Sequence, residues 1–324
     1  MKNLTKIKEA DTRRAEVELN RRMARKSIMQ VLGNWQLYLM LLPAVLYLIL
    51  FVYKPMYGIQ IAFREFKFKT GITGSEWVGL NQFETLFNSY WFPLAFKNTL
   101  IISITSLVVT FPLPIIFAML INEVRNEKVK RTVQTISYAP HFISTVVMCG
   151  VVIMLLNPTN GIVNIFIEML GGSRVAFTQD PKLFKWVYIF SGVWQSLGWS
   201  SVIYFAALAA VDKGLLEAAE IDGANRIHRI IHINIPTILP TIMIQLILNA
   251  GKIMSLGYEK VLLLQNQMNL MGSEILATYV YKVGLQQYSY SFSTAANIFN
   301  SVCNCILLIT VNRLSKWITK QGIF

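Results

Sequence analysis

The chain of 324 residues is 54% hydrophobic and only 15% charged, and its mean hydropathy is +0.47. A soluble domain averages about 45–50% apolar residues, so this composition, gathered in long uncharged blocks, excludes an ordinary soluble protein. The net charge of +13 would suggest nucleic-acid binding in a soluble protein. Here the basic residues flank apolar blocks, which is typical of membrane topology signals. We therefore predict an all-α membrane protein that binds no nucleic acid.

Six stretches approach the roughly 20 apolar residues that a spanning helix needs. We predict spans at residues 35–53, 100–121, 135–156, 186–211, 238–256 and 291–311. Residues 1–34 then form a basic tail, and residues 35–324 form the transmembrane domain. We expect the first span to be uncleaved, because no small-residue cleavage site follows it.

The distribution of Lys and Arg predicts the orientation of the chain in the membrane. Nineteen of the thirty basic residues fall on one side if the N-terminus is inside. Positive residues accumulate in cytoplasmic segments, so we expect both termini in the cytoplasm of a bacterial cell. The segments counted on that side are 1–34, 122–134, 212–237 and 312–324.

Two long loops, at residues 54–96 and 257–290, lie on the outer side in this topology. Both are rich in aromatic residues, with Trp77 and Trp91 in the first and Tyr279 in the second. Such loops contact a soluble partner or lie along the membrane surface, and the sequence does not distinguish these alternatives.

The cytoplasmic segment 212–237 reads as a short amphipathic helix held outside the membrane. It has an apolar, small-residue side that another protein can approach closely, and carboxylates that favour a helix N-terminal half. Gly223 permits a turn without steric cost. We expect Pro236 to end the stretch that returns the chain to the bilayer. The residues of this predicted docking surface are Glu217, Ala218, Ala219, Glu220, Asp222 and Gly223.

The same segment resembles the signature of binding-protein-dependent ABC importer permeases. That signature is Glu-Ala-Ala, three residues, Gly, nine residues, then Ile-x-Leu-Pro. It is matched by Glu217-Ala218-Ala219, Gly223, Ile233 and Pro236, with Ile235 in place of the usual leucine. Residues 55–63 and 257–260 look similar to the oligosaccharide branch of this family, which includes alginate importers.

The resemblance implies a type I ABC importer permease fold with six transmembrane helices and a cytoplasmic coupling helix. It also implies a second permease subunit, expected to be a different chain, two ATPase subunits and an extracytoplasmic solute-binding protein. The substrate would be an oligosaccharide. The chain contains no Gly-x-x-x-x-Gly-Lys phosphate loop, so we expect no enzyme activity or cofactor here, with ATP and Mg in the partner ATPases.

Polar residues inside the predicted spans are candidates for the substrate pathway. Lys252 is the only charge well inside a span; it either faces the pathway or snorkels to the interface. In the first case it would suit a uronate-bearing sugar. Each of the others could instead make interhelical hydrogen bonds. The remaining candidates are Asn249, Trp194, Gln195, Asn297 and Asn300.

The sequence offers little support for a catalytic or metal site, or for other classes of membrane protein. His228 and His232 are four residues apart, but two ligands are too few for a metal site. An ion-driven transporter would need acidic residues in its spans, and a membrane enzyme would need clustered carboxylates or histidines. Neither pattern is present, and the coupling signature disfavours a purely structural protein.

Overall fold

The computed structural model describes residues 33–319, so nearly all of the predicted basic tail at residues 1–34 lies outside the described residues. The chain divides into two compact units, with the boundary between Gln60 and Ile61. We describe each unit by itself.

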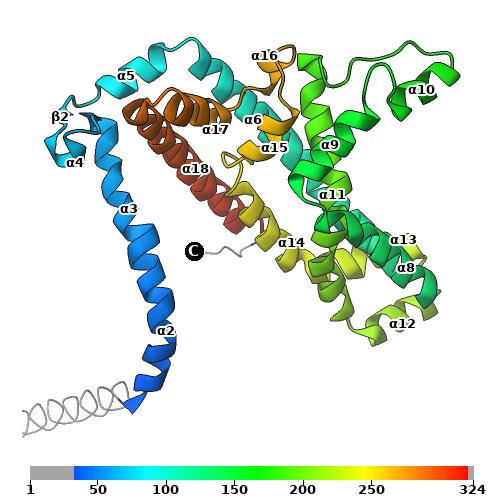
Figure 1. Ribbon diagram of the computed structural model, residues 1–324. Helices are drawn as coiled ribbons and strands as arrows, with labels where there is room; N and C mark the ends of the chain where they lie inside the picture. The colour runs from blue at the N-terminus through cyan, green and yellow to red at the C-terminus, as the bar shows by residue number, and fades with distance from the viewer. Residues whose placement is uncertain (1–32, 320–324) are drawn as a thin grey trace, which may run out of the picture. The chain divides into compact units, whose positions relative to one another are not determined.

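The described part of the first unit is a helix with an apolar surface. Helix α2 (Trp35–Tyr47) continues through a π-helical stretch, Leu48–Tyr53, into the short α3 (Lys54–Met56) (Figure 1). None of the side chains in these three elements is buried. An apolar helix without protein packing is suited to a hydrocarbon environment, in agreement with the predicted span 35–53.

Proline explains two of the π-helical stretches. Pro55 follows directly after Leu48–Tyr53 and Lys54, and Pro236 follows Ile230–Asn234 and Ile235. Proline has no N–H for the i→i−4 bond, and a wider π turn lets the helix continue past it. The expectation that Pro236 ends the return stretch is therefore wrong: one helical stretch runs from Arg226 to Ala250.

The second unit begins with a small two-stranded hairpin, residues 64–77, which the sequence did not predict and which we call the rim. Strands β1 (Arg64–Glu65) and β2 (Glu76–Trp77) pair antiparallel around the short α4 (Gly71–Gly74), and α5 (Asn81–Asn88) follows. Arg64 fastens the turn, because its Nη1 donates to the carbonyl O of Ser75 at 2.8 Å.

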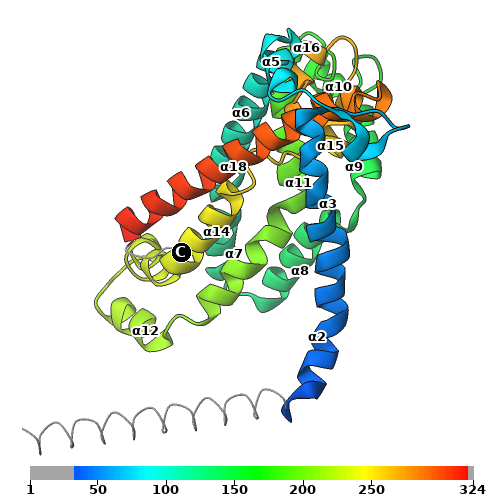
Figure 2. The same cartoon turned by 90° about the vertical axis from the view of Figure 1, so that its left-hand side faces the viewer.

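Long helices form the body of the second unit, and α11 packs against α6, α7, α8 and α14 (Figures 1 and 2). Short helices connect them. The long helices are α6 (Trp91–Thr110), α7 (Pro112–Asn122), α11 (Pro181–Ala209), α14 (Ile235–Ala250) and α18 (Tyr290–Thr319). The short helices are α8 (Glu127–Tyr138), α9 (Thr145–Leu155), α10 (Ile162–Met169), α12 (Lys213–Ile221), α13 (Arg226–Arg229), α15 (Tyr258–Leu264), α16 (Leu270–Ser273) and α17 (Leu276–Tyr281).

Within the described residues, four helical stretches are long and apolar enough to cross a membrane, or five if one bent pair counts as a span. The four are Trp35–Phe63, Trp91–Asn122, Arg226–Ala250 and Tyr290–Arg313. The predicted span 186–211 corresponds to α11, which is 29 residues long but carries several tryptophans, serines and glycines that lower its hydropathy. The six-span arrangement is consistent with these helices.

The predicted span 135–156 is not one straight helix. Helices α8 and α9 meet at an angle of 103°. Pro140 interrupts the backbone bonding, and Ser144 starts α9 as its N-cap, with its Oγ accepting from the Val147 N–H at 3.4 Å. At 11 residues, α9 is about 16 Å long, too short to cross a bilayer alone.

Close contact between α8 and α11 requires a glycine. A Cβ built on Gly198 would lie 2.3 Å from the carbonyl O of Ser137, which no real side chain tolerates. The close approach supports the bent arrangement, and the Gln195 Nε2, one turn before on α11, donates to the carbonyl O of Ile143 at 2.9 Å in the bend.

Candidate functional site

Helix α12 is a short, well-terminated element that contains the signature residues. Asp212 caps its N-terminus by accepting from the Gly214 N–H at 2.8 Å. At the other end, the Ala224 N–H donates to the carbonyl O of Ala219 at 2.9 Å, and Gly223 has a φ of +80°. This is a Schellman ending, for which glycine is the favoured residue. The turn predicted at Gly223 is therefore confirmed.

An ion-pair network and an apolar contact hold α12 against the helix bundle. Arg229 of α13 pairs with Glu220 of α12 at 3.0 Å and with Glu123, at the end of α7, at 3.7 Å. The Arg229 side chain is only 14% exposed. Leu216 packs against the core cluster that includes Tyr204 and Leu208 of α11. These contacts connect α12 to α7 and α11.

The opposite side of α12 and Ile227 of α13 present apolar side chains to the exterior. Ile221 is 87% exposed, and Leu215 and Ile227 are more than half exposed. Glu217, Ala218 and Asp222 are also exposed, while Ala219 is partly buried. We call the set Leu215, Glu217, Ala218, Ile221, Asp222 and Ile227 the α12 docking surface. Exposed apolar residues rimmed by charges mark interaction sites.

The two neighbouring histidines play a local role. Their rings are stacked at a centroid distance of 5.8 Å. The Nδ1 of His228 lies 3.0 Å from the Asn225 Oδ1, and that of His232 lies 3.1 Å from the carbonyl O of His228. Within residues 33–319, no group of three or more His, Cys, Asp or Glu side chains is arranged to hold a metal ion.

A polar cavity with a volume of about 590 Å³ lies between α6, α7, α11, α14 and α15. Two predicted pathway residues, Gln195 and Asn249, line it. The Asn249 amide donates to the carbonyl O of Gln245 at 2.7 Å, which leaves its Oδ1 available. Hydroxyl, amide and aromatic groups in one cavity suit a polar, ring-shaped ligand. The other polar and aromatic lining residues are Ser106, Thr110, Phe111, Tyr188, Ser196, Trp199, Ser200, Tyr204, Gln245 and Lys260.

Lys260 is the charged residue of this cavity, and the sequence analysis missed it. Its Nζ donates to the carbonyl O of Tyr188 at 2.7 Å and lies 4.4 Å from the centre of the Tyr188 ring. Burial lowers the pKa of Lys260 from its ordinary value to about 8. Because Lys260 belongs to the segment 257–290, which was predicted to be an outer loop, hydropathy gave no signal that it would fold into the bundle.

Lys252, the predicted pathway charge, is placed differently from the expectation. Helix α14 ends at Ala250, and Lys252 lies in the turn that follows, with an exposed side chain. Lys252 is therefore not inside a spanning helix, and it does not line the cavity. Gly251 and the turn hydrogen bond from the Lys252 N–H to the carbonyl O of Asn249 at 3.0 Å account for the early end.

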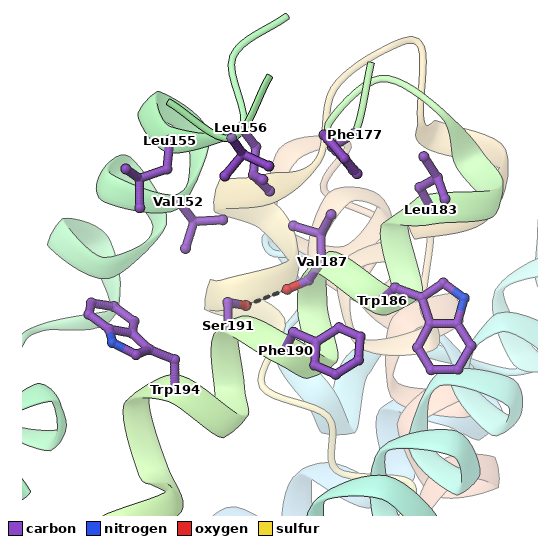
Figure 3. Close-up of a pocket in the computed structure, with 11 residues that line it drawn as sticks. Val152, Leu155, Leu156, Phe177, Leu183, Trp186, Val187, Phe190, Ser191 and Trp194 are labelled. Carbon is purple, nitrogen blue, oxygen red and sulfur yellow. Dashed lines mark hydrogen bonds between the residues drawn. The ribbon is translucent and has the colours of Figure 1, made fainter. Parts of the chain in front are cut away.

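Trp194 lines a second, apolar pocket of about 420 Å³. Figure 3 shows Trp186, Phe190 and Trp194 on α11, with Val152 and Leu155 of α9 across the pocket. The Ser191 hydroxyl does not offer its hydrogen to a ligand in the pocket, because it donates to the carbonyl O of Val187 at 2.6 Å. Trp194 and Gln195 are neighbours in sequence but belong to different surfaces of α11.

The two predicted residues on α18 do not line the polar cavity either. Asn297 is exposed. Asn300 is partly buried, and its Oδ1 has no hydrogen-bond partner among the described residues. Of the six predicted pathway residues, the structure brings Gln195 and Asn249 together.

Residues 251–289 fold back onto the helices through buried polar contacts. The Lys282 Nζ pairs with the Glu274 carboxylate at 2.5 Å, and the Glu274 side chain is 4% exposed. Asn98 of α6 donates to the carbonyl O of Glu274, and Asn269 donates to that of Thr178. These contacts hold the segment that includes α15 and Lys260 against α6 and against the chain that precedes α11.

Comparison with known proteins agrees with this arrangement. Residues 110–320 match the model of the family described as binding-protein-dependent transport system inner membrane component. The chain is 42% identical over 300 residues to the polygalacturonan/rhamnogalacturonan transport system permease protein YteP of Bacillus subtilis, covering 93% of this chain and 94% of that protein. It is 38% identical to the B. subtilis protein LplB, covering 89% and 91%.

Two solved structures are also similar along most of the chain. One is a bacterial ABC transporter involved in the import of the acidic polysaccharide alginate, with a TM-score of 0.83 and 39% identity over 90% of this chain and 98% of that chain. The other is a bacterial alginate ABC transporter in complex with an alginate pentasaccharide-bound periplasmic protein, with a TM-score of 0.84 and 39% identity over 91% and 98%. The chain therefore belongs to the binding-protein-dependent transport system inner membrane component family, and it is a transport permease rather than an enzyme.

Proposed function

We propose that this chain forms half of the translocation pathway of an ATP-driven importer for acidic oligosaccharides. A second permease subunit forms the other half, a solute-binding protein delivers the sugar from outside, and two partner ATPase subunits bind ATP and Mg. The substrate class follows the similar proteins, which are permeases for polygalacturonan and rhamnogalacturonan and an importer of alginate, all polymers that carry uronate groups.

The observation that carries the proposal is the α12 docking surface. Ile221 and Leu215 are exposed on a helix whose other side is fixed to α7 and α11 by Arg229 and Leu216. A rigid connection of this kind transmits the displacement of a bound partner into the bundle. We infer that an ATPase subunit grips this surface and that nucleotide-driven closure moves the helices.

The proposed contact between α12 and an ATPase subunit also implies an orientation of the chain in the membrane. If α12 contacts a cytoplasmic ATPase, segment 212–237 is cytoplasmic, in line with the Lys and Arg count that favours both termini inside. The protein would then be a multi-pass component of the bacterial cytoplasmic membrane, with the polar cavity along the substrate route. Loops 54–96 and 257–290 would face the binding protein.

Reconstitution of the complete importer tests the substrate class. The complex, with its second permease and ATPases, is inserted into proteoliposomes, and ATP hydrolysis is measured with binding protein and either trigalacturonate or maltotriose. We expect stimulation and uptake with the acidic trisaccharide. Stimulation by maltotriose alone would overturn the acidic class.

Site-specific photo-crosslinking tests the coupling and the orientation together. A benzophenone amino acid at Ile221 should form an adduct with the ATPase subunit in membranes. The same group at Trp77, which is 58% exposed in the rim of the second unit, serves as the matched control and should form none. An ATPase adduct at Trp77 and none at Ile221 would refute the assigned orientation.

A further inference from the structure

Lys260 carries a charge that the described structure does not balance. Its side chain takes part in none of the ion pairs found among residues 33–319. Glu259, the preceding residue, is exposed and forms no ion pair with Lys260 among residues 33–319. The titratable groups that contact Lys260 are Tyr188 of α11, whose ring and carbonyl it contacts, and Cys149 of α9, whose Sγ is 4.0 Å from the Lys260 carbonyl O. Neither is an acid that would neutralise an ammonium group.

Lys260 is partly buried. An ammonium group that is withdrawn from water without a paired carboxylate is costly, so proteins retain one where a ligand or partner supplies the counter-charge. Lys260 lines the 590 Å³ cavity together with Gln195, Gln245 and Asn249. The amides offer hydrogen bonds for hydroxyl groups, and Trp199 and Tyr204 offer aromatic faces in the same cavity. The cavity thus combines the groups that recognise a sugar ring with one cation.

Gly192 of α11 lies next to the ammonium group of Lys260. A Cβ built on Gly192 would lie 3.0 Å from the Lys260 Nζ, closer than side chains normally approach. Glycine at this position therefore leaves room beside α11 for the Nζ, which donates to the carbonyl O of Tyr188 at the cavity wall. In contrast, Lys252 lies eight residues earlier, in a turn, and its side chain is exposed.

We infer that Lys260 is a binding residue for the carboxylate of a uronate unit in transit, with Gln195 and Asn249 hydrogen-bonding the neighbouring sugar hydroxyls. This inference rests on the proposed function and identifies the side chain that would select acidic over neutral sugars inside the permease. A charge-assisted contact between ammonium and carboxylate is stronger than a neutral hydrogen bond.

Two substitutions separate charge from structural anchoring. Lys260→Gln keeps a donor for the Tyr188 carbonyl and loses the charge, whereas Lys260→Arg keeps the charge. Lys252→Gln is the matched control. Each variant is assembled in the complete importer, and uptake of trigalacturonate in proteoliposomes is measured beside ATP hydrolysis without substrate.

We expect Lys260→Gln to reduce trigalacturonate uptake at least tenfold while substrate-free ATP hydrolysis stays at the wild-type rate. Lys260→Arg should retain at least a third of the uptake, and Lys252→Gln should retain all of it. Wild-type uptake by Lys260→Gln would overturn the inference and leave the proposed function intact. Loss of uptake in Lys260→Arg with full uptake in Lys260→Gln would assign Lys260 a structural role and also overturn it. A wild-type importer that ignores trigalacturonate would overturn the proposed function and this inference with it.

Discussion

Two segments between helices, residues 212–237 and residues 251–289, use their polar residues in opposite ways. In the first, α12 and α13 keep most of their charged side chains exposed and are fixed to the bundle mainly through Arg229 and Leu216. In the second, Glu274 and Lys282 form a buried pair, and Lys260 extends into a cavity wall.

The first segment keeps side chains exposed where a protein partner could bind, whereas the second segment uses its side chains for contacts within the chain. The proposed docking surface requires available apolar and charged groups, and Ile221 is 87% exposed. A segment that forms part of a cavity wall must pair its buried polar groups with other groups of the chain, because buried donors and acceptors without partners are costly. Substitutions in the two segments are therefore expected to affect different measurements.

Lys282→Met should give the largest loss of stability. It leaves the Glu274 carboxylate, which is 4% exposed, without its cation, and breaking such a pair costs about 3 kcal/mol. Thermal unfolding of the purified importer measures the change. Lys67→Met is the control, because the Lys67–Glu65 pair is exposed at 3.9 Å and such pairs contribute at most about 1 kcal/mol. Equal effects of the two substitutions would contradict the buried role of Lys282.

Ile221→Asp should impair coupling without affecting the fold. Truncating the centre of an interface costs about 2 kcal/mol, or roughly 30-fold in affinity, so the ATPase subunits should dissociate during purification. The thermal stability of the permease should not change, because Ile221 makes little internal contact. Met268→Asp, at a position 66% exposed in the other segment, is the control and should retain the ATPases. Full ATPase retention by Ile221→Asp would remove α12 from the interface.

Uptake of trigalacturonate should fall as the pH rises from 7 to 9. The pKa of Lys260 is lowered to about 8, so the protonated fraction falls about tenfold over this interval while the substrate carboxylates remain ionised. Uptake is expressed relative to substrate-free ATP hydrolysis at each pH. Lys260→Arg should flatten the profile, because arginine stays protonated. An unchanged slope in that variant would show that another group titrates.

Gly223→Ala should have the smallest effect. Its φ of +80° costs a side chain about 1–2 kcal/mol, although a Cβ there would meet open space. We expect faster hydrogen exchange at the Ala224 N–H, whose bond to Ala219 closes the helix end. Gly223→Asn, which tolerates this conformation better, should lie between the alanine variant and the wild type. Equal exchange in all three proteins would mean that the turn does not depend on glycine.

Local sequence patterns were sufficient for several parts of the molecule. Span 35–53 and the apolar core of span 291–311 follow from continuous hydrophobic runs, and these helices exist. The turn at Gly223 follows from local backbone chemistry, because a helix end with positive φ favours glycine. The signature at Glu217 to Pro236 identified the family, since its spacing reflects one short helix and its return. None of these inferences needs contacts between distant residues.

Other features depended on contacts that no local pattern encodes. Hydropathy predicted a straight span at residues 135–156, but Pro140, the Ser144 cap and the packing of α8 at Gly198 produce a bend. It also placed Lys252 inside a helix that in fact ends at Ala250. Hydropathy averages over a window and does not register where a helix stops.

The sequence by itself determined that the chain is a helical membrane permease, because apolar runs and a fixed motif spacing act over neighbouring residues. It also predicts α12 as the short helix that an ATPase partner contacts. Only the tertiary structure decided which lysine enters the polar cavity. Lys260 reaches α11 because Gly192 leaves room for its ammonium group and because the segment 251–289 is held against the bundle by Asn98, Asn269 and the Glu274–Lys282 pair. These residues are far apart in the sequence and come together only when the chain folds, so a local sequence pattern does not predict their contacts.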